Sequence, residues 1–124
     1  MKILSCSDLK QMLEDQQDFM LLNVLSETSF RKAHIPNSQN IPVSEAGFVE
    51  RVENVLRGKD NDYPIVTYCA GIQCNASKDA ANLLIEADHT NVSAFEGGME
   101  EWLEAGYPAS CDDAASCEEH CSSE

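Results

Sequence analysis

The sequence predicts an α/β protein whose buried parallel sheet carries helices on both faces. Short, continuous apolar runs alternate along the chain with amphipathic segments, and such runs are typical of strands that are covered on both sides. An apolar run ends at Tyr68, an uncharged loop opens with Cys69, and a helical pattern begins at Ala76. In parallel sheets ligands bind beyond the carboxyl ends of the strands, where this loop lies. A length of 124 residues is that of one domain with a sizeable core.

Apolar runs bounded by turn residues give the candidate strands. They are residues 20–24, 39–41, 64–68 and 91–95, with residues 2–4 as a weaker fifth.

Apolar spacing marks the helices between these strands. Leu9, Met12 and Leu13 mark the first, with Ser7 as its expected N-cap. The apolar positions of residues 48–56 share one helical face, and Gly58 ends that helix. The helix after the cysteine loop has Asn75 as its expected cap, with Ala80, Ala81 and Leu84 on one face. Met99 and Trp102 lie at helical spacing and are expected in the core, before a helix stop at residues 105–108.

Charge and composition exclude several classes of function. The net charge is −14 and no basic stripe exists, so we expect no nucleic-acid partner. No run approaches the roughly 18–20 apolar residues that cross a membrane, so we expect no membrane association. The apolar run at the start of the sequence is too short for a secretory signal peptide. Because no such signal is found, the six cysteines indicate reduced thiols in the cytoplasm.

The last residues differ in composition from the rest. From Cys111 onward the chain has five acidic residues, three cysteines, one histidine and no basic residue. We expect residues 1–109 to form the domain and residues 110–124 to be a mobile acidic tail. Cys111, Cys117, His120 and Cys121 allow a metal-binding alternative, but they lack the paired spacing of structural zinc sites. We therefore expect no metal and no cofactor.

Cys69 is the candidate nucleophile. Free cysteine has a pKa near 8.5, so about 3% is thiolate at pH 7, and a decrease of about one unit raises this to roughly a quarter. Loop N–H groups and a helix N-terminus are expected to favour the thiolate, which attacks electrophilic sulfur. The expected anion-binding loop comprises Ala70, Gly71, Ile72, Gln73, Cys74 and Asn75.

Several spaced motifs resemble those of the rhodanese domain. The first half carries residues 21–30 and the stretch from Ala33-His34-Ile35-Pro36 to Pro42. The second half carries Tyr68-Cys69, Ala80-Ala81, Asn91-Val92, residues 95–102 and residues 105–108. The resemblance covers nearly the whole body. It implies a five-stranded, mostly parallel sheet with flanking helices, and a sulfurtransferase whose loop cysteine, here Cys69, carries sulfane sulfur as a persulfide.

The sequence also departs from this family. Asn23-Val24-Leu25 stands where rhodaneses commonly have Asp-Val-Arg, and the loop is about two residues longer, with no Arg or Lys between Cys69 and Ser77. Each charge-assisted hydrogen bond lost to a thiosulfate dianion costs about 1.5–3 kcal/mol. We therefore expect a neutral or protein-bound persulfide as donor and a thiol as acceptor.

Other interpretations remain open. Cys74 is either a thiol that packs the loop or a resolving thiol that attacks an oxidised or persulfidated Cys69. The whole domain is alternatively a non-enzymatic module for protein contacts or thiol-redox sensing. A phosphatase is disfavoured, because related cysteine phosphatases have an arginine six positions after the nucleophile, where Asn75 stands. His34 is expected to be structural, and His89 to be a solvated turn residue.

Overall fold

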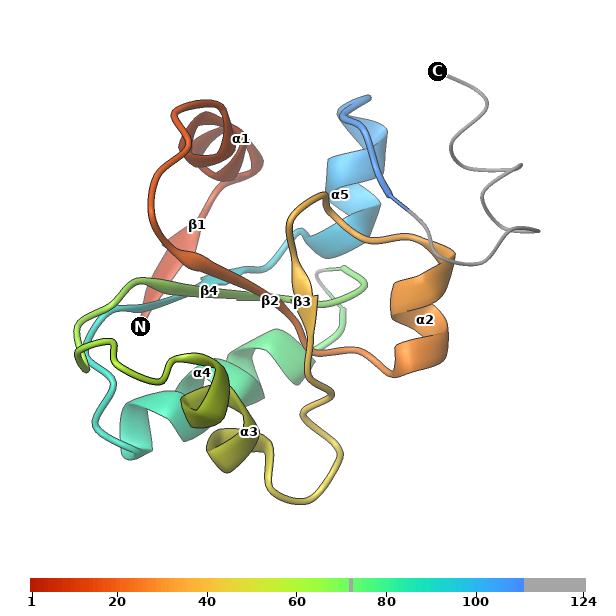
Figure 1. Ribbon diagram of the computed structural model, residues 1–124. Coiled ribbons are helices and arrows are strands. Elements are labelled where there is room, and N and C mark those ends of the chain that lie inside the picture. Colours follow the sequence, from red (N-terminus) through yellow and green to blue (C-terminus); the bar gives the residue numbers. More distant parts are fainter. Residues whose placement is uncertain (72, 111–124) are drawn as a thin grey trace.

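The computed structural model describes residues 1–71 and 73–110. Five strands and five helices alternate through this part of the chain (Figure 1). In order they are β1 Lys2–Leu4, α1 Cys6–Glu14, β2 Met20–Asn23, α2 Glu27–Lys32, β3 Gln39–Asn40, α3 Phe48–Val55, β4 Ile65–Tyr68, α4 Ala76–Glu86, β5 Val92–Phe95 and α5 Gly98–Glu104.

The strands form one sheet in the order β1-β5-β4-β2-β3, and every strand pairing in it is parallel. The sheet agrees with the predicted fold class, including the weaker strand at residues 2–4. Strand β4 is central, and its residues are buried. The strand that leads to Cys69 therefore lies where packing is most complete.

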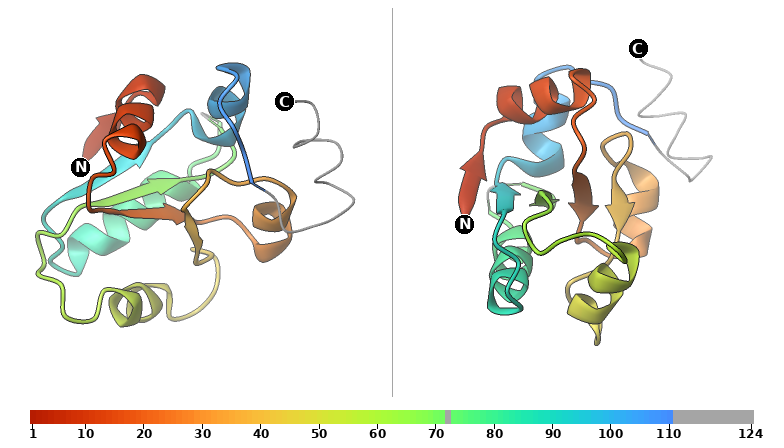
Figure 2. Two further views of the ribbon diagram at one scale, coloured as in Figure 1. Left: turned by 45° about the horizontal axis from the view of Figure 1, so that its top comes forward. Right: turned by 60° about the vertical axis from the view of Figure 1, so that its left-hand side comes forward.

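Helices cover both faces of the sheet (Figure 2). Helices α3 and α4 lie on one face, where their apolar side chains form a core cluster with β2, β4 and β5. Helices α1 and α5 lie on the other face, and their cluster includes Leu9, Tyr68 and Trp102. Trp102 is only 1% exposed and donates a hydrogen bond through Nε1 to the carbonyl of Pro108, so its predicted core position is confirmed.

The helix ends correct two sequence predictions. Helix α1 is capped by Ser5 rather than Ser7, because Ser5 Oγ accepts the Asp8 N–H at 3.1 Å and Ser7 lies inside the helix. Asn75 does hold the N-cap position of α4, but its side chain makes no capping hydrogen bond. Gly58 follows α3 with a φ of +85°, as expected of a residue that ends a helix.

Backbone pairing extends to Ser110, the last described residue. It forms an antiparallel bridge with His34 through two backbone hydrogen bonds of 2.9 and 2.8 Å. The division into a domain and a tail stays a prediction, because residues 111–124 lie outside the described part. None of the helices within residues 1–71 and 73–110 has the length and apolar character needed to cross a membrane.

Candidate active site

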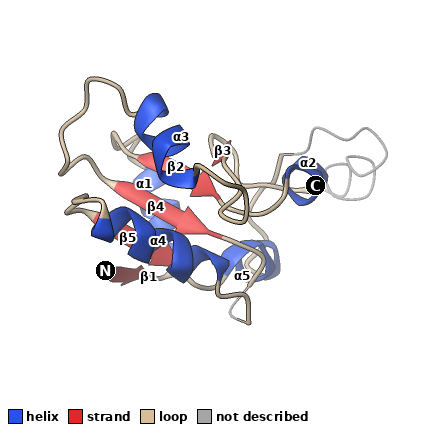
Figure 3. Ribbon diagram, turned by 90° about the horizontal axis from the view of Figure 1, so that it is seen from below, coloured by secondary structure: helices blue, strands red, loops and turns tan. Residues whose placement is uncertain are grey.

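Cys69 follows the central strand β4 directly and is 0% exposed. Its neighbouring strands end at the same level, since Tyr68 is in register with Asn23 of β2 and with Phe95 of β5. Figure 3 shows the loop after β4 leading into α4 at this edge of the sheet. The sequence therefore places a thiol at the carboxyl edge, the usual ligand-binding edge of a parallel sheet.

Neighbouring segments hold the residues on both sides of Cys69, through the side chain of Tyr68 and the backbone of residues 69 and 70. Tyr68 Oη accepts the N–H of Ile35 at 3.0 Å and is 2.8 Å from the hydroxyl of Ser38. The carbonyl of Cys69 accepts the N–H of Met99 at 2.9 Å, and the carbonyl of Ala70 accepts the N–H of Glu100 at 2.8 Å. The first turn of α5 thus fixes the start of the loop.

Gly98 allows this close approach of α5 to the loop. A β-carbon at Gly98 would collide with the carbonyl oxygen of Cys69 and lie 2.8 Å from the carbonyl carbon of Ala70. Its φ of +57° is also in the region that favours glycine. Sequence reasoning interpreted Gly97-Gly98 only as a turn. The signal that could have revealed its role is a glycine pair one residue after β5, the strand that neighbours the cysteine strand.

The sulfur of Cys69 faces carbonyl oxygens in the loop. Its thiol donates to the carbonyl of Cys74 at 3.3 Å and lies 4.0 Å from the carbonyl of Gly71. Burial raises the pKa of Cys69, as does its hydrogen bond with the Cys74 thiol, while the hydroxyl and N–H of Ser77 oppose the shift. The expectation that Cys69 ionises readily is wrong in this conformation, because desolvation outweighs the backbone dipoles.

Cys74 has the opposite character. It is partly exposed. Its partial burial acts to raise the pKa of its thiol, but hydrogen bonds from Cys69 and from the N–H groups of Ala76 and Ala70 outweigh that effect and lower the pKa. The two thiols therefore influence each other's pKa, and the ionised form is favoured at Cys74 relative to Cys69.

Ser77 is a site residue that sequence reasoning missed. It is 0% exposed, and its Oγ has no hydrogen-bond partner, although the hydroxyl acts to lower the pKa of Cys69. The hydroxyl of Thr67 in β4 donates to the carbonyl of Ser77 at 2.8 Å and ties this turn of α4 to the sheet. The available signal was its spacing, because Ser77 shares the buried helix face of Ala80, Ala81 and Leu84.

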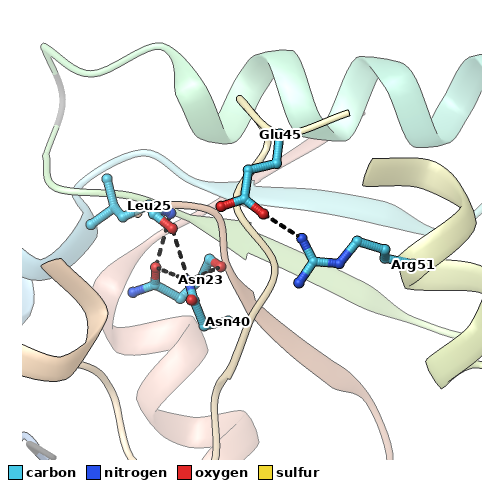
Figure 4. Close-up of polar contacts among 5 residues, drawn as sticks. All are labelled: Asn23, Leu25, Asn40, Glu45 and Arg51. Carbon is cyan, nitrogen blue, oxygen red and sulfur yellow. Dashed lines mark hydrogen bonds and ion pairs between the residues drawn. The ribbon is translucent and has the colours of Figure 1, made fainter. Parts of the chain in front are cut away.

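An uncharged cluster stands at the end of β2, where the family commonly has an acid and a base (Figure 4). Asn23 Oδ1 accepts the N–H of Leu25 at 2.9 Å, and Asn40 Nδ2 donates to the carbonyl of Leu25 at 2.8 Å. Asn23 is 0% exposed, and its Nδ2 has no hydrogen-bond partner. The side chain of Leu25 packs against the core cluster that contains Cys69, as does Cys74.

The structure describes most of the predicted loop. Gly71 is buried, Cys74 is partly exposed, and Ala70, Gln73 and Asn75 are exposed, while Ile72 lies outside the described residues. The functional roles assigned to Cys69 and to these loop residues stay predictions. Within residues 1–71 and 73–110, no group of three or more His, Cys, Asp or Glu side chains could hold a metal ion. The metal-binding alternative for Cys111, Cys117, His120 and Cys121 falls outside that part of the chain.

The two histidines weighed from the sequence have different outcomes. His34 is buried, stacks on Phe30 with ring centroids 3.8 Å apart and donates through Nδ1 to the carbonyl of Phe30 at 2.8 Å. These contacts agree with a structural role. His89 is only 5% exposed, so its prediction as a solvated residue is wrong. The turn folds back so that His89 N–H reaches the carbonyl of Leu84, and Nε2 lies 3.2 Å from the Glu53 carboxylate.

Solved structures of similar fold include several rhodanese-like proteins. The rhodanese-like domain of an Anabaena protein is 26% identical, with a TM-score of 0.76 over 90% of this chain and 80% of that one. A rhodanese-related protein from Thermoplasma volcanium is also 26% identical, with a TM-score of 0.70 over 89% and 98% of the two chains. A thiosulfate sulfurtransferase from Pseudomonas aeruginosa shares the fold at 20% identity and a TM-score of 0.78, over 90% of this chain but 20% of that one.

The sequence itself gives the same assignment. No curated protein matches it. The sequence model of the rhodanese-like domain, however, matches residues 5–105, from the cap of α1 to the end of α5. The five-stranded parallel sheet and the cysteine at the end of its central strand agree with this match. The chain belongs to the rhodanese-like domain family.

Proposed function

We propose that this protein is a sulfurtransferase that carries sulfane sulfur as a persulfide on Cys69 and passes it to a thiol or another nucleophilic acceptor. The observation that carries the proposal is the placement of a fully buried thiol at the end of the central strand, under a loop that α4 and α5 hold in place. A buried persulfide is protected from water and from unrelated thiols. Membership of the family that includes sulfurtransferases supports this chemistry.

The reaction consists of two sulfur transfers without net oxidation. In the first, a protein thiolate attacks the outer sulfur of a donor R–S–SH, a new S–S bond forms, and R–S⁻ leaves and takes up a proton. In the second, an acceptor thiolate attacks the outer sulfur of the protein persulfide. The electron pair of the broken S–S bond then returns to the protein cysteine. Neither step requires a cofactor.

The donor we propose is a neutral small persulfide or a persulfide-bearing protein. Lys78, which follows Ser77 in α4, is 2.7 Å from the carboxylate of Glu96. Arg51 is 2.7 Å from Glu45, whose segment runs along the end of β2 (Figure 4). Cations that are already paired with carboxylates bind a thiosulfate dianion poorly. Cys6, Cys69 and Cys74 are free thiols, which supports a reducing compartment such as the cytoplasm.

A non-enzymatic module for protein contacts or thiol-redox sensing is the second candidate. The observation that favours it is the raised pKa of the buried Cys69 thiol, together with the uncharged side chains of Asn23 and Leu25. Such a module would take up no sulfane sulfur. The same experiment therefore separates the two candidates.

The test is intact-mass measurement after incubation with cysteamine persulfide, whose ammonium balances the persulfide anion, followed by desalting and a wash over resin-bound thiol, which does not reach a buried sulfur. We expect the wild-type protein to retain one added sulfur, a gain of about 32 Da that cyanide removes. Tandem mass spectrometry should locate this sulfur on Cys69, and Cys69→Ser should not retain it. A wild-type protein that gains no sulfur would leave the non-enzymatic module as the better interpretation.

A further inference from the structure

The loop after β4 contains two thiols with unequal access to solvent. Cys69 is 0% exposed, whereas Cys74 is partly exposed. Both are free, and the Cys69 thiol donates to the carbonyl of Cys74 at 3.3 Å. A donor molecule that approaches this conformation therefore meets Cys74 before it can reach Cys69.

The groups that stabilise an anion also surround Cys74. The N–H groups of Ala70 and Ala76 act to lower the pKa of the Cys74 thiol. The Cys69 sulfur also faces the carbonyl oxygens of Gly71 and Cys74, which accept from a thiol and repel a thiolate, so the N–H of Ser77 is opposed there. The loop thus favours the thiolate at Cys74 over the thiolate at Cys69.

We propose that Cys74 is the catalytic thiol that takes sulfane sulfur from the donor, and that Cys69 then receives this sulfur from Cys74 inside the loop. This inference rests on the proposed sulfurtransferase function and assigns the order in which the two thiols act. Cys74 then forms a persulfide first, and Cys69 holds the protected one.

The internal transfer balances without an oxidant. Cys74 Sγ⁻ attacks the outer sulfur of R–S–SH, the Cys74–sulfur bond forms, and R–S⁻ leaves and is protonated. The proton of Cys69 then moves to the outer sulfur of the ionised Cys74 persulfide, and Cys69 Sγ⁻ attacks that sulfur. The Cys69–sulfur bond forms, the Cys74–sulfur bond breaks, and its electron pair restores the Cys74 thiolate.

Ser77 supplies what the second step needs at Cys69. Its hydroxyl is buried and has no hydrogen-bond partner in the resting site, and both the hydroxyl and the N–H of Ser77 favour the ionised form of Cys69. The hydrogen bond from Thr67 to the Ser77 carbonyl fixes this turn of α4 to β4. A free, pre-positioned donor can stabilise the negative charge that develops on Cys69 during the transfer.

The test measures the rate of sulfur loading from cysteamine persulfide, with rapid alkylation and intact-mass detection before any wash. Wild type is compared with Cys74→Ser, Cys74→Ala and Cys69→Ser. Cys6→Ser is the matched control, because Cys6 is a free, buried cysteine in the other core cluster. Far-UV circular dichroism and thermal melting establish that each variant is folded.

We expect both Cys74 variants to load Cys69 at least tenfold more slowly than wild type. Cys69→Ser should still take up one sulfur on Cys74 but lose it in the thiol wash, because Cys74 is partly exposed. Cys6→Ser should match wild type throughout. Two results would overturn the transfer from Cys74 to Cys69 and leave the sulfurtransferase proposal intact. They are wild-type loading rates in folded Cys74 variants, and no sulfur uptake before the wash in Cys69→Ser. A wild-type protein without any uptake would overturn both.

Discussion

Gly98 lies against the backbone of Cys69 so closely that no β-carbon fits between them. The contact brings the N–H groups of Met99 and Glu100 to the carbonyls of Cys69 and Ala70. The start of the loop is therefore held by a helix that is nearly thirty residues away along the chain. The position of the nucleophile depends on a residue that carries no reactive group.

Replacing Gly98 with alanine should displace the loop and reduce sulfur loading at least tenfold. The added methyl group collides with backbone atoms, which cannot rotate away as a side chain can. Gly106→Ala is the matched control, since Gly106 also has a positive φ, +81°, but a β-carbon there would meet no atom within 4 Å. Both variants incur the left-handed backbone cost of about 1–2 kcal/mol. Equal rates of sulfur loading in the two variants would show that the close contact between Gly98 and the Cys69 backbone does not position the loop.

Leu25→Arg should improve the use of thiosulfate. An arginine at this position restores the base of the family's common Asp-Val-Arg pattern and offers a charge-assisted hydrogen bond of about 1.5–3 kcal/mol. We expect the thiosulfate KM to fall about tenfold, since each 1.4 kcal/mol is a factor of ten. Leu25→Gln has a similar length without the charge and serves as the control. A low-micromolar KM in the wild type would instead refute the expected preference for uncharged donors.

Alkylation of Cys74 should respond to changes at Cys69. The hydrogen bond from Cys69 helps to lower the pKa of Cys74, so Cys69→Ala should raise that pKa and slow iodoacetamide labelling near pH 7. Cys69→Ser keeps a hydroxyl donor and should retain most of the wild-type rate. The pH profile of Cys74 labelling should therefore move to higher pH in Cys69→Ala alone. Identical profiles for the three proteins would show that the thiols do not interact.

Mild oxidation should join Cys69 and Cys74 in a reversible disulfide. Hydrogen peroxide converts the reactive thiolate to a sulfenic acid, which the neighbouring thiol attacks with loss of water. A bridge requires Cα atoms roughly 4.4–6.8 Å apart, a separation that a curled loop can reach. Peroxide titration with non-reducing peptide mapping measures the product. Over-oxidation of one cysteine while the other stays free would rule out a resolving role.

Deletion of residues 111–124 should leave the domain folded and its sulfur chemistry intact. Ser110 must be kept, because its two backbone hydrogen bonds with His34 close the C-terminal end of the paired region. We expect the melting temperature to change by less than about 2 °C, as for surface changes that cost under about 0.5 kcal/mol. A much larger decrease, or one equivalent of zinc in the purified full-length protein, would support the metal-binding alternative for the tail.

The fold was predictable because its signals are local. The buried strands are short apolar runs, and α1, α3, α4 and α5 show apolar faces, so the type and order of these elements followed from periodicity. Helix α2 was not predicted, because none of its residues is buried and it therefore has no apolar face to detect. Boundaries were harder. Ser5 and Ser7 are equally good caps by residue type, and the position of β1 decides between them.

The site was only partly predictable because its main properties arise from contacts between distant segments. The position of Cys69 followed from the strand–loop–helix pattern. The raised pKa did not, because desolvation depends on how the loop closes over the sulfur. Burial of His89 depends on a turn that folds back onto α4 and on Glu53 from α3. No spacing rule within the chain reports such packing.

The loop that carries both thiols is anchored at each end by a hydrogen bond to a neighbouring element. At one end the carbonyl of Cys69 is bound by α5, and at the other end the carbonyl of Ser77 is bound by the hydroxyl of Thr67. Lengthening a loop whose ends are already held costs little, about 0.6 kcal/mol for a doubling. The scaffold can therefore accept loops of different length and chemistry without refolding. This makes the domain a suitable host for transplanting loops from relatives and comparing the reactivity of each on one constant framework.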